Sequence, residues 1–436
     1  MSHILRNISQ QVSVVLAADD NAESIGGIAL KFIVLFAGIS LMTIPVSTLV
    51  STRSYAQKIV TTSQEPVTLP QESAIGSFEL IATFTGPMPT GISVSASRRI
   101  FVNFPRWGDN VEYTVAELRG NKTVAYPPGI KQNAEGTKQE DALISVQSVV
   151  VDPKDRLWIL DTGSPLFAPT SYGGPKLIGV DLKTNKIFKK ILFPTDVALP
   201  TTYLNDVRFD LRRGTEGMAF ITDSSDKGAN AIIVVDLATG KSFRRLNDHS
   251  STKAVPGFVP IVEGQPLLER EPGKPPQHLK MGADGIAIGA DGKRLYYCPL
   301  AGRHLYSVSV DALVDQTQSD NQVAMTVVDE GDKGGGADGL ETDALGRIYL
   351  TNYEHNGIQR RLNDGTFETL VSDPRILWPD TLSVANDGYL YFTNNQLERQ
   401  ARYQNGNDLR QKPYSLLRVK IDSGPIKFDT SVKERK

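Results

Sequence analysis

The sequence has little of what disulfide-stapled or zinc-stapled folds need. Its 436 residues contain one cysteine, Cys298, and five histidines. A single cysteine excludes a disulfide within the chain and a cysteine-rich zinc site. The histidines show no HExxH or other ligand spacing. A metal bound by histidine or cysteine is therefore not indicated.

An excess of one charge is also missing. The formal net charge is −2, from 47 Lys and Arg against 49 Asp and Glu. The sequence has no run of Lys and Arg with interleaved aromatic residues, which is the pattern that a phosphate backbone requires. We therefore expect no nucleic-acid partner.

What the sequence does contain is a repeat. Residues 336–352, GADGLETDALGRIYLTN, combine a polar start, a short apolar strand, a tight turn, a second apolar strand and a polar end. Copies of this plan lie roughly 40 to 80 residues apart, a period that suits a four-stranded propeller blade with loop insertions. The other five copies begin at Pro89, Val146, Leu204, Gly282 and Trp378. Six copies predict an all-β fold, a six-bladed β-propeller.

Two strands at the ends of the repeat region lack partners nearby in the sequence. Phe78–Thr85 precedes the first copy, and Ser415–Ile421 is a third strand of the last blade with no fourth strand after it. Pairing them would complete the last blade and close the ring, which removes exposed sheet edges. We therefore predict a propeller over residues 78–424, preceded by a linker over 57–77 and followed by a polar tail over 425–436.

The first 56 residues are predicted to direct the chain to a membrane. Phe32–Val50 is an uncharged, largely apolar run long enough to cross a hydrocarbon layer. The small residues Ser54 and Ala56 fit cleavage by a signal peptidase before Gln57. Residues 1–56 are thus a signal peptide or a membrane anchor. Either reading predicts an extracytoplasmic protein, secreted or periplasmic, that contacts membrane only through this segment.

Acids and amides gather where the inner strands begin and the second strands end. Successive strands of a blade run antiparallel, so these positions share one face of the propeller, at one mouth of the central channel. Such a ring can bind a hard cation through oxygen or hold a ligand amine. The residues predicted to bind ligand are Gln147, Asn205, Asp206, Asp284, Asp338, Asp380, Asn103, Phe104, Asp161, Asn352 and Asn394.

The alternative is that these side chains fix loops by accepting from backbone N–H groups. Asp284, Asp338 and Asp380 stand at equivalent positions in three blades, which is more than turn chemistry needs. Asp338 and Asp284 are also the candidates for a catalytic role. On the opposite face the turns, such as Asp152–Asp155, are predicted to be ordinary hairpins. The long connection Leu246–Met281 is predicted to be a lid, a binding loop or disordered.

Four segments carry a resemblance to a known family. VQSVVVDPKDRLWILDTG, LNDVRFD, DGIAIGADGKRLYYCPLAGRHLYSV and ADGLETDALGRIYLTNYEHNGI, in this order, resemble the major royal jelly protein/Yellow family in one of its bacterial branches. The resemblance implies a six-bladed propeller that is usually secreted, and some salivary members bind biogenic amines in the channel. A dopachrome-converting isomerase activity is attached to the name. The chain departs from the insect pattern in lacking the cysteines for disulfides.

A more distant likeness is to calcium-dependent, gluconolactonase-type propellers. It implies a metal site to which Asn205 and Asp284 or Asp338 would contribute, and calcium or another divalent cation is the one cofactor it suggests. The first-blade position, Pro89-Thr90-Gly91, lacks the carboxylate that such a site uses.

Three hypotheses follow for the function. We expect an exported propeller that binds a small amine or aromatic ligand in its channel. The alternative is an enzyme at the same mouth, either a metal-dependent lactonase or a dopachrome-type tautomerase, so whether the chain is an enzyme stays open. A third class is a scaffold that binds partners through its outer strands.

Overall fold

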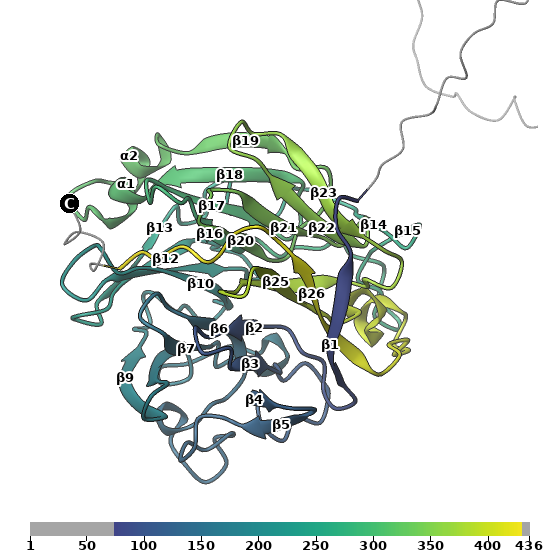
Figure 1. The fold of residues 1–436 in the computed structure, drawn as a ribbon, viewed down its shortest axis with the longest axis horizontal. Coiled ribbons are helices and arrows are strands. Elements are labelled where there is room, and N and C mark those ends of the chain that lie inside the picture. The colour runs from purple at the N-terminus through teal and green to yellow at the C-terminus, as the bar shows by residue number, and fades with distance from the viewer. Residues whose placement is uncertain (1–73, 430–436) are drawn as a thin grey trace, which may run out of the picture. The chain divides into compact units, whose positions relative to one another are not determined.

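The computed structural model describes residues 74–429, within which six four-stranded antiparallel sheets form the blades of a β-propeller (Figure 1). The predicted fold class is confirmed. The predicted signal peptide or anchor over residues 1–56, which includes Phe32–Val50, lies outside the described residues. Within residues 74–429, no helix combines the length and the apolar character that crossing a membrane requires.

In each of the first three blades, the strands follow one another outward from the channel. Blade 1 consists of β2 (Ile92–Val94), β3 (Ile100–Asn103), β4 (Val115–Arg119) and β5 (Lys122–Ala125). Blade 2 consists of β6 (Val146–Val151), β7 (Arg156–Asp161), β8 (Lys176–Asp181) and β9 (Lys186–Leu192). Blade 3 consists of β10 (Leu204–Asp210), β11 (Met218–Asp223), β12 (Ile232–Asp236) and β13 (Ser242–Arg245).

The next two blades repeat this order. Blade 4 consists of β16 (Ala283–Ile288), β17 (Arg294–Pro299), β18 (His304–Ser309) and β19 (Val328–Asp332). Blade 5 consists of β20 (Leu340–Thr342), β21 (Ile348–Asn352), β22 (Gly357–Arg361) and β23 (Phe367–Ser372). The connection between β18 and β19 contains two short helices, α1 (Val310–Val314) and α2 (Asp320–Ala324).

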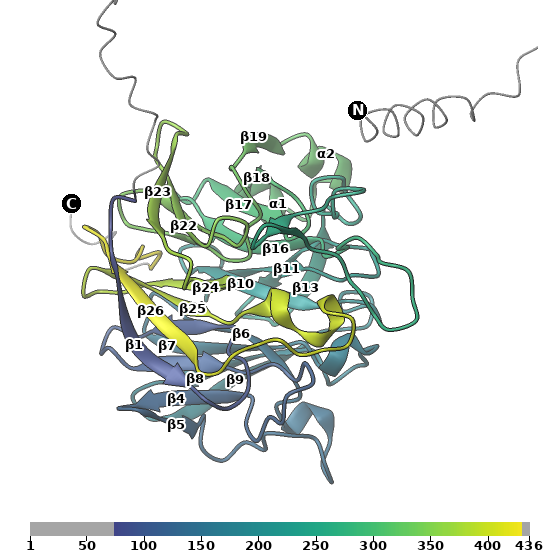
Figure 2. The ribbon, with the colours of Figure 1, turned by 90° about the vertical axis from the view of Figure 1, so that its right-hand side faces the viewer.

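Blade 6 closes the ring as predicted. It consists of β24 (Pro379–Val384), β25 (Tyr389–Asn394), β26 (Tyr414–Lys420) and, outermost, β1 (Phe78–Phe84). Figures 1 and 2 show β1 alongside β26, with Phe84 opposite Tyr414 in the register. Near the channel, a hydrogen bond also joins the last blade to the first. Thr393 Oγ1 in blade 6 donates to the carbonyl oxygen of Thr90, which precedes β2 of blade 1, at 2.5 Å. Closure leaves β26 paired on both edges, which protects it from pairing with another chain.

The hairpins between inner and second strands are held by a repeated side-chain device. In blade 2, Asp152 Oδ1 accepts from the N–H groups of Lys154 and Arg156, while Oδ2 accepts from Trp158 Nε1. In blade 5, Asp343 takes the equivalent place. Bonds of this kind fix a tight turn, and Asp155 in the first turn has a φ of 57°. The expected hairpin reading is confirmed here.

The core is divided into layers between neighbouring blades. Between blades 2 and 3, for example, Trp158 stacks on Phe209 with ring centroids 5.2 Å apart. Both rings are almost fully buried, and burial of one such side chain stabilises the fold by roughly 1.5–3 kcal/mol. Apolar layers between rigid sheets hold the blades in place and so position the loops at the channel mouth.

Two long connections cover that mouth. One is Leu246–Met281, which contains the hairpin of β14 (Ile261–Val262) and β15 (Gln265–Pro266). The other joins β25 to β26 and contains the 3₁₀ turns η3 (Leu397–Arg399) and η4 (Ala401–Tyr403). They lie together at the right of Figure 1 and face the viewer in Figure 2, joined by ion pairs of Arg399 with Glu263 and Arg402 with Glu269. The expected lid or loop is thus an ordered cover. The remaining 3₁₀ turns are η1 (Gln139–Asp141) and η2 (Pro165–Phe167).

The described part of the chain continues past the expected end of the propeller at Gly424. The N–H of Leu211 donates to the carbonyl oxygen of Phe428 at 2.9 Å, and the N–H of Ala344 donates to that of Gly424 at 2.9 Å. Phe428 is buried against blades 3 and 4. Residues 425–429 therefore pack on the propeller, at the end of the channel opposite the mouth.

Candidate functional site

The mouth is narrow because the inner strands approach one another closely where they begin. A Cβ at Gly285 would overlap the carbonyl oxygen of Asp338 in the next blade, and a Cβ at Gly339 would overlap that of Asp380. Glycine alone allows this approach between backbones. The repeated Asp-Gly dipeptides therefore bring three carboxylates from blades 4, 5 and 6 to one level of the channel.

These carboxylates are buried and engaged with each other and with amides. Asn205 Nδ2 of blade 3 donates to Asp284 Oδ1 at 2.6 Å, and Asp284 is hydrogen-bonded to the carboxyl group of Asp338. Trp378 Nε1 donates to Asp338 Oδ2 at 2.7 Å. Asn395 Nδ2 donates to Asp380 Oδ2 at 2.7 Å. Each aspartate is less than a tenth exposed.

Burial favours the uncharged form of these carboxyl groups. It raises the pKa of Asp284 well above its usual range, and the neighbouring charge of Asp338 raises it further. The same two causes raise the pKa of Asp380. Burial raises the pKa of Asp338 only to about 6, because the hydrogen bond from Trp378 favours its ionised form. Asp338 therefore ionises more readily than Asp284, and a negative charge in this group is best accommodated on Asp338.

A layer of aromatic rings lies above the carboxylates. Phe167 stacks on Trp107 with centroids 5.4 Å apart and on Tyr203 with centroids 4.5 Å apart. Trp107 Nε1 donates to the Tyr203 hydroxyl at 2.8 Å, and that hydroxyl donates to Gln147 Oε1 at 3.1 Å. The rings are thus fixed to blade 2 at the edge of the acidic cluster.

Arg402 divides the mouth into two spaces. Its guanidinium lies 5.3 Å from the ring centroids of both Phe167 and Tyr403. On the inner side is a chamber with a cavity volume of about 20 Å³, lined by Gln147, Asn205, Asp284 and Asp338 among others. On the outer side is an open basin of about 570 Å³, bordered by Asp226, Lys227, Glu271 and Arg410 among others. Trp107, Phe167, Gln400 and Arg402 line both spaces.

Below the chamber, Arg208 crosses the centre of the ring. From blade 3 its guanidinium reaches past blade 4 and donates to the carbonyl oxygen of Leu340 in blade 5. Its Nη2 lies 4.0 Å from Asp206 Oδ2 and 3.5 Å from Glu341 Oε2. This arginine separates the acidic mouth from a second cavity at the far end of the channel.

The comparison with protein families decides the relationship of this chain to known proteins. The sequence model of the family described as major royal jelly protein matches residues 144–424, more than half of the chain. The chain belongs to the major royal jelly protein family.

Individual members of this family are distant relatives. The chain is 24% identical to major royal jelly protein 7 of Apis mellifera over 60% of its own length and 62% of the relative's. It is 26% identical to the protein Yellow of Drosophila guanche over 58% of its length and 44% of the relative's. A Yellow-related salivary protein of Phlebotomus duboscqi is 27% identical over 53% of this chain and 59% of the relative's length. The alignments span less than two thirds of each of these relatives.

Solved structures with a related architecture include propellers of other families. A gluconolactonase from Xanthomonas campestris superposes with a TM-score of 0.47 at 11% identity, covering 79% of this chain and 89% of the other. A calcium-binding regucalcin from Agrobacterium tumefaciens superposes with a TM-score of 0.48 at 15% identity, covering 80% of this chain and 97% of the other. At these scores the likeness carries no argument about function.

In this major royal jelly family propeller, the predicted site residues separate into two groups. Gln147, Asn205, Asp284 and Asp338 line the inner chamber. Asp206 and Asp380 lie close enough to raise the pKa of Asp284 by their charge. These six belong to the mouth. The others hold the scaffold, and they are Asn103, Phe104, Asp161, Asn352 and Asn394.

Two of these scaffold residues show what they bind instead. Asp161 accepts from the N–H groups of Ile144 and Ser145 and forms a fully buried ion pair of 2.9 Å with Lys176. Asn103 Nδ2 donates to the carbonyl oxygens of Val146 and Gln147 at 3.0 Å each, which ties blade 1 to blade 2. For these positions the structure matches the alternative, in which polar side chains bind backbone and fix the loops.

Four mouth residues were not expected from the repeat. Phe167 comes from the connection between β7 and β8, and Gln400, Arg402 and Tyr403 come from the connection between β25 and β26. Both connections leave a second strand, on the face predicted to carry the mouth. The length of these two connections, rather than any motif, was the one feature of the sequence that indicated a contribution to the mouth.

The suggested calcium ligands do not fit a cation as they are arranged. Across residues 74–429, no three His, Cys, Asp or Glu side chains come together in a way that would hold a metal ion. The amide nitrogen of Asn205 donates to Asp284, and one carboxyl oxygen of Asp338 accepts from Trp378 Nε1. We therefore derive no chemistry through calcium for Asn205, Asp284 and Asp338.

Proposed function

We infer that this protein is an exported propeller that binds a small cationic aromatic molecule at the mouth of its channel. The observation that carries this inference is the buried Asp284–Asp338 pair directly beneath the rings of Trp107 and Phe167. A charged carboxylate in a low-dielectric site attracts a cation strongly, and aromatic faces favour both cations and rings.

The inner chamber suits an ammonium group. Its volume of about 20 Å³ is enough for one water-sized group. Asp338, with a pKa of about 6, is the acid of its wall that ionises most readily, while Asn205 and Gln147 offer amide oxygens. A monocation with several N–H donors would satisfy these groups. The rest of the ligand would pass beside the stacked rings of Trp107 and Phe167, through the space that Arg402 now fills, toward the outer basin.

Arg402 has to move for such a ligand to enter. It now places a cation over Phe167 and lines the inner chamber. A ligand ammonium brings its own charge to Asp338, so the two cations exclude each other. We expect the guanidinium to swing outward on binding while it keeps its ion pair with Glu269. Long side chains rearrange in this way at many interfaces whose backbone stays fixed.

Export is the second part of the proposal. The apolar run Phe32–Val50 is long enough to direct the chain into a membrane, and Ser54-Tyr55-Ala56 fits a cleavage site. One relative is by name a salivary protein. Fractionation of cells that express the full chain would find it outside the cytoplasm, and recovery in the cytoplasm alone would contradict this part.

Calorimetry with matched ligands tests the binding proposal. Tyramine carries an ammonium and a ring, and 4-hydroxyphenylethanol replaces the ammonium with a hydroxyl. We expect tyramine to bind at least tenfold more tightly, because hydrogen bonds to a charged group are the stronger ones. Asp338→Asn should abolish this preference, whereas the exposed control Asp196→Asn should keep it. Equal binding of both compounds to the native protein would contradict the proposal.

One observation favours a second candidate, a tautomerase. Asp338 has a pKa of about 6 and lies in hydrogen-bond contact with Asp284, whose pKa is well above the usual range. Two groups with separated pKa values can act as base and acid in a proton transfer. Turnover of a quinone-like substrate such as dopachrome, lost in Asp338→Asn, would support this reading. Binding of such a compound without turnover would favour the first candidate function, ligand binding.

A further inference from the structure

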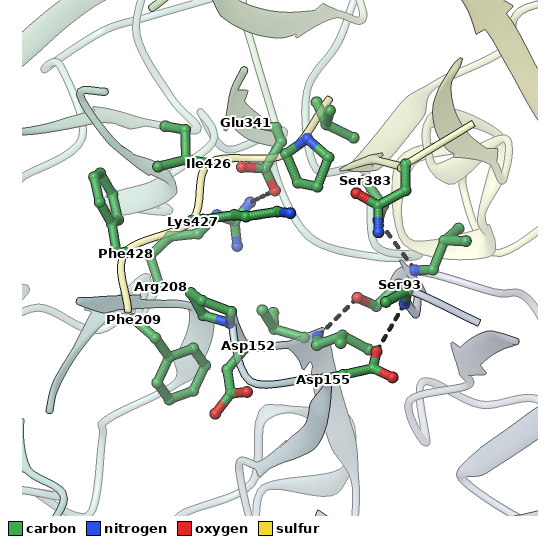
Figure 3. Close-up of a pocket in the computed structure, with 18 of the residues that line it drawn as sticks. Ser93, Asp152, Asp155, Arg208, Phe209, Glu341, Ser383, Ile426, Lys427 and Phe428 are labelled. Carbon is green, nitrogen blue, oxygen red and sulfur yellow. Dashed lines mark hydrogen bonds and ion pairs between the residues drawn. The ribbon is translucent and has the colours of Figure 1, made fainter. Parts of the chain in front are cut away.

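The far end of the channel holds a larger space than the inner chamber at the mouth. Below Arg208, where the inner strands end, lies a cavity with a volume of about 320 Å³ (Figure 3). This volume falls in the range of small-molecule sites. Much of its wall is apolar and is contributed by Ile92, Val94, Val150, Phe209, Ile288 and Leu382.

The C-terminal segment closes one side of this space, which we call the lower cavity. Pro425–Phe428 line it, and Figure 3 shows Lys427 extending from this segment over the lower cavity. The segment is anchored at both ends. Arg347 Nη1 pairs with Asp422 at 2.6 Å, and the guanidinium of Arg212 lies 4.1 Å from the centre of the Phe428 ring.

Hydrogen-bond donors without acceptors point into the lower cavity. Ser93 Oγ accepts from the N–H of Val151 at 2.8 Å, and Ser383 Oγ accepts from the N–H of Val94 at 3.1 Å. Neither hydroxyl hydrogen has an acceptor among residues 74–429, so both can donate to a ligand. Both serines are less than a tenth exposed.

Two cations add to these donors. Arg208 is 6% exposed, and its Nε has no hydrogen-bond partner in the described chain. Lys427 makes no hydrogen bond or ion pair with residues 74–429. A buried donor left without a partner is costly, so a built-in acceptor or a ligand is expected at Arg208.

Four acidic residues line the wall, Asp152, Asp155, Glu341 and Asp429, and none of them is free. Asp152 uses both oxygens within its own hairpin and pairs with Arg156 at 2.6 Å. Asp155 accepts from the N–H of Ala96 at the rim. Glu341 faces Arg208 and accepts from the N–H of Thr342. The unused groups of the lower cavity are therefore mainly donors, and two of them are cationic.

We propose that the lower cavity binds a small molecule with one carboxylate and an apolar body. Ser93, Ser383, Arg208 and Lys427 would hold the carboxylate, and the apolar ends of the inner strands would surround the body. The site is separate from the mouth because Arg208 lies between them. It takes a ligand of the opposite charge.

Decanoate, with decanol as its neutral counterpart, is the probe for titration calorimetry on the full chain. We expect decanoate to bind at least tenfold more tightly than decanol. Lys427→Gln should weaken decanoate binding about tenfold, since a hydrogen bond to a charged group is lost at a residue that carries no part of the core. Ser383→Ala should weaken it several-fold. The exposed control Lys122→Gln should bind as the native protein does.

Asp338→Asn separates this site from the mouth. It should leave decanoate affinity unchanged, and saturating tyramine should not compete with decanoate. The proposal is overturned if decanoate does not bind, if decanol binds as tightly, or if Lys427→Gln behaves like Lys122→Gln. Competition by tyramine would place decanoate at the mouth and would equally overturn it.

Discussion

Arg208 of blade 3 and Glu341 of blade 5 face each other across the ring, with Nη2 and Oε2 3.5 Å apart. Between the two lies the whole of blade 4 in the sequence. Arg208 also lowers the pKa values of Asp206 and Glu341, which burial alone would raise further. The residue that blocks the channel thus also neutralises acids on both sides of it.

Removing Arg208 should therefore cost more than one interaction. Arg208→Met leaves Asp206 and Glu341 without their cation, and breaking a buried pair in this way costs about 3–5 kcal/mol. Urea unfolding at pH 7 measures the loss. Adding Glu341→Gln to Arg208→Met should recover part of it, because one uncompensated acid is removed. Arg119→Met, at an exposed arginine whose partner Glu117 keeps its ion pair with Arg99, should change stability by less than about 1 kcal/mol.

The close approach of the inner strands gives a second prediction. In Gly339→Ala, the new Cβ overlaps the carbonyl oxygen of Asp380, and both are backbone-bound and cannot turn away. Overpacking of this kind costs about 1–3 kcal/mol or more. Thermal unfolding should show the loss, together with weaker tyramine binding because Asp338 and Asp380 are pushed apart. Gly86→Ala, where nothing lies within 4 Å of the new Cβ, is the control and should leave both unchanged.

The pKa of Asp338 gives a third prediction. A cationic ligand favours the ionised carboxylate, so its affinity should be constant above pH 7 and should fall as the pH drops through about 6. Below that pH the loss should approach tenfold for each pH unit. Calorimetry with tyramine between pH 5 and 8 measures it, and Asp338→Asn should show no such slope. A flat profile in the native protein would place the ligand away from Asp338.

The sequence was sufficient for those features that repeat along it. The period gave six blades, the unpaired strands gave the closure between β1 and β26, and the positions before the inner strands gave Asp284 and Asp338 at the mouth. Each follows from local pattern, because the antiparallel blade fixes which end of every strand faces the mouth.

Features that depend on contacts between distant blades did not follow from the pattern. The sequence predicts both Asp161 and Asp284 at the mouth. Asp161 instead pairs with Lys176, because β8 brings that lysine beside it. Arg208 stands at an ordinary inner-strand position, and its partner Leu340 lies 132 residues further along the chain. The positions of Phe167 and Arg402 at the mouth were likewise not predicted, since both lie in irregular loops and no periodicity predicts where a loop side chain will point.

Glu398 gives the last prediction, one of stability rather than binding. It lies in the cover of the mouth, is 3% exposed, and neither of its carboxyl oxygens has a hydrogen-bond partner in the described chain. Burial raises its pKa to about 8, and the nearby charge of Glu263 adds to the effect. Arg399 Nε, 3.6 Å away, compensates little because it is itself paired with Glu263.

The folded state therefore keeps a proton that the unfolded chain releases above about pH 4.5. The folded pKa is raised, so the free energy of unfolding should fall as the pH rises from about 4.5 to 8. Glu398→Gln carries no charge at any pH and should remove this slope. It should match the native protein near pH 5 and exceed it by a few kcal/mol at pH 8 in urea unfolding. Glu112→Gln, at an exposed residue, should keep the native slope, and an unchanged slope in Glu398→Gln would show that another group sets it.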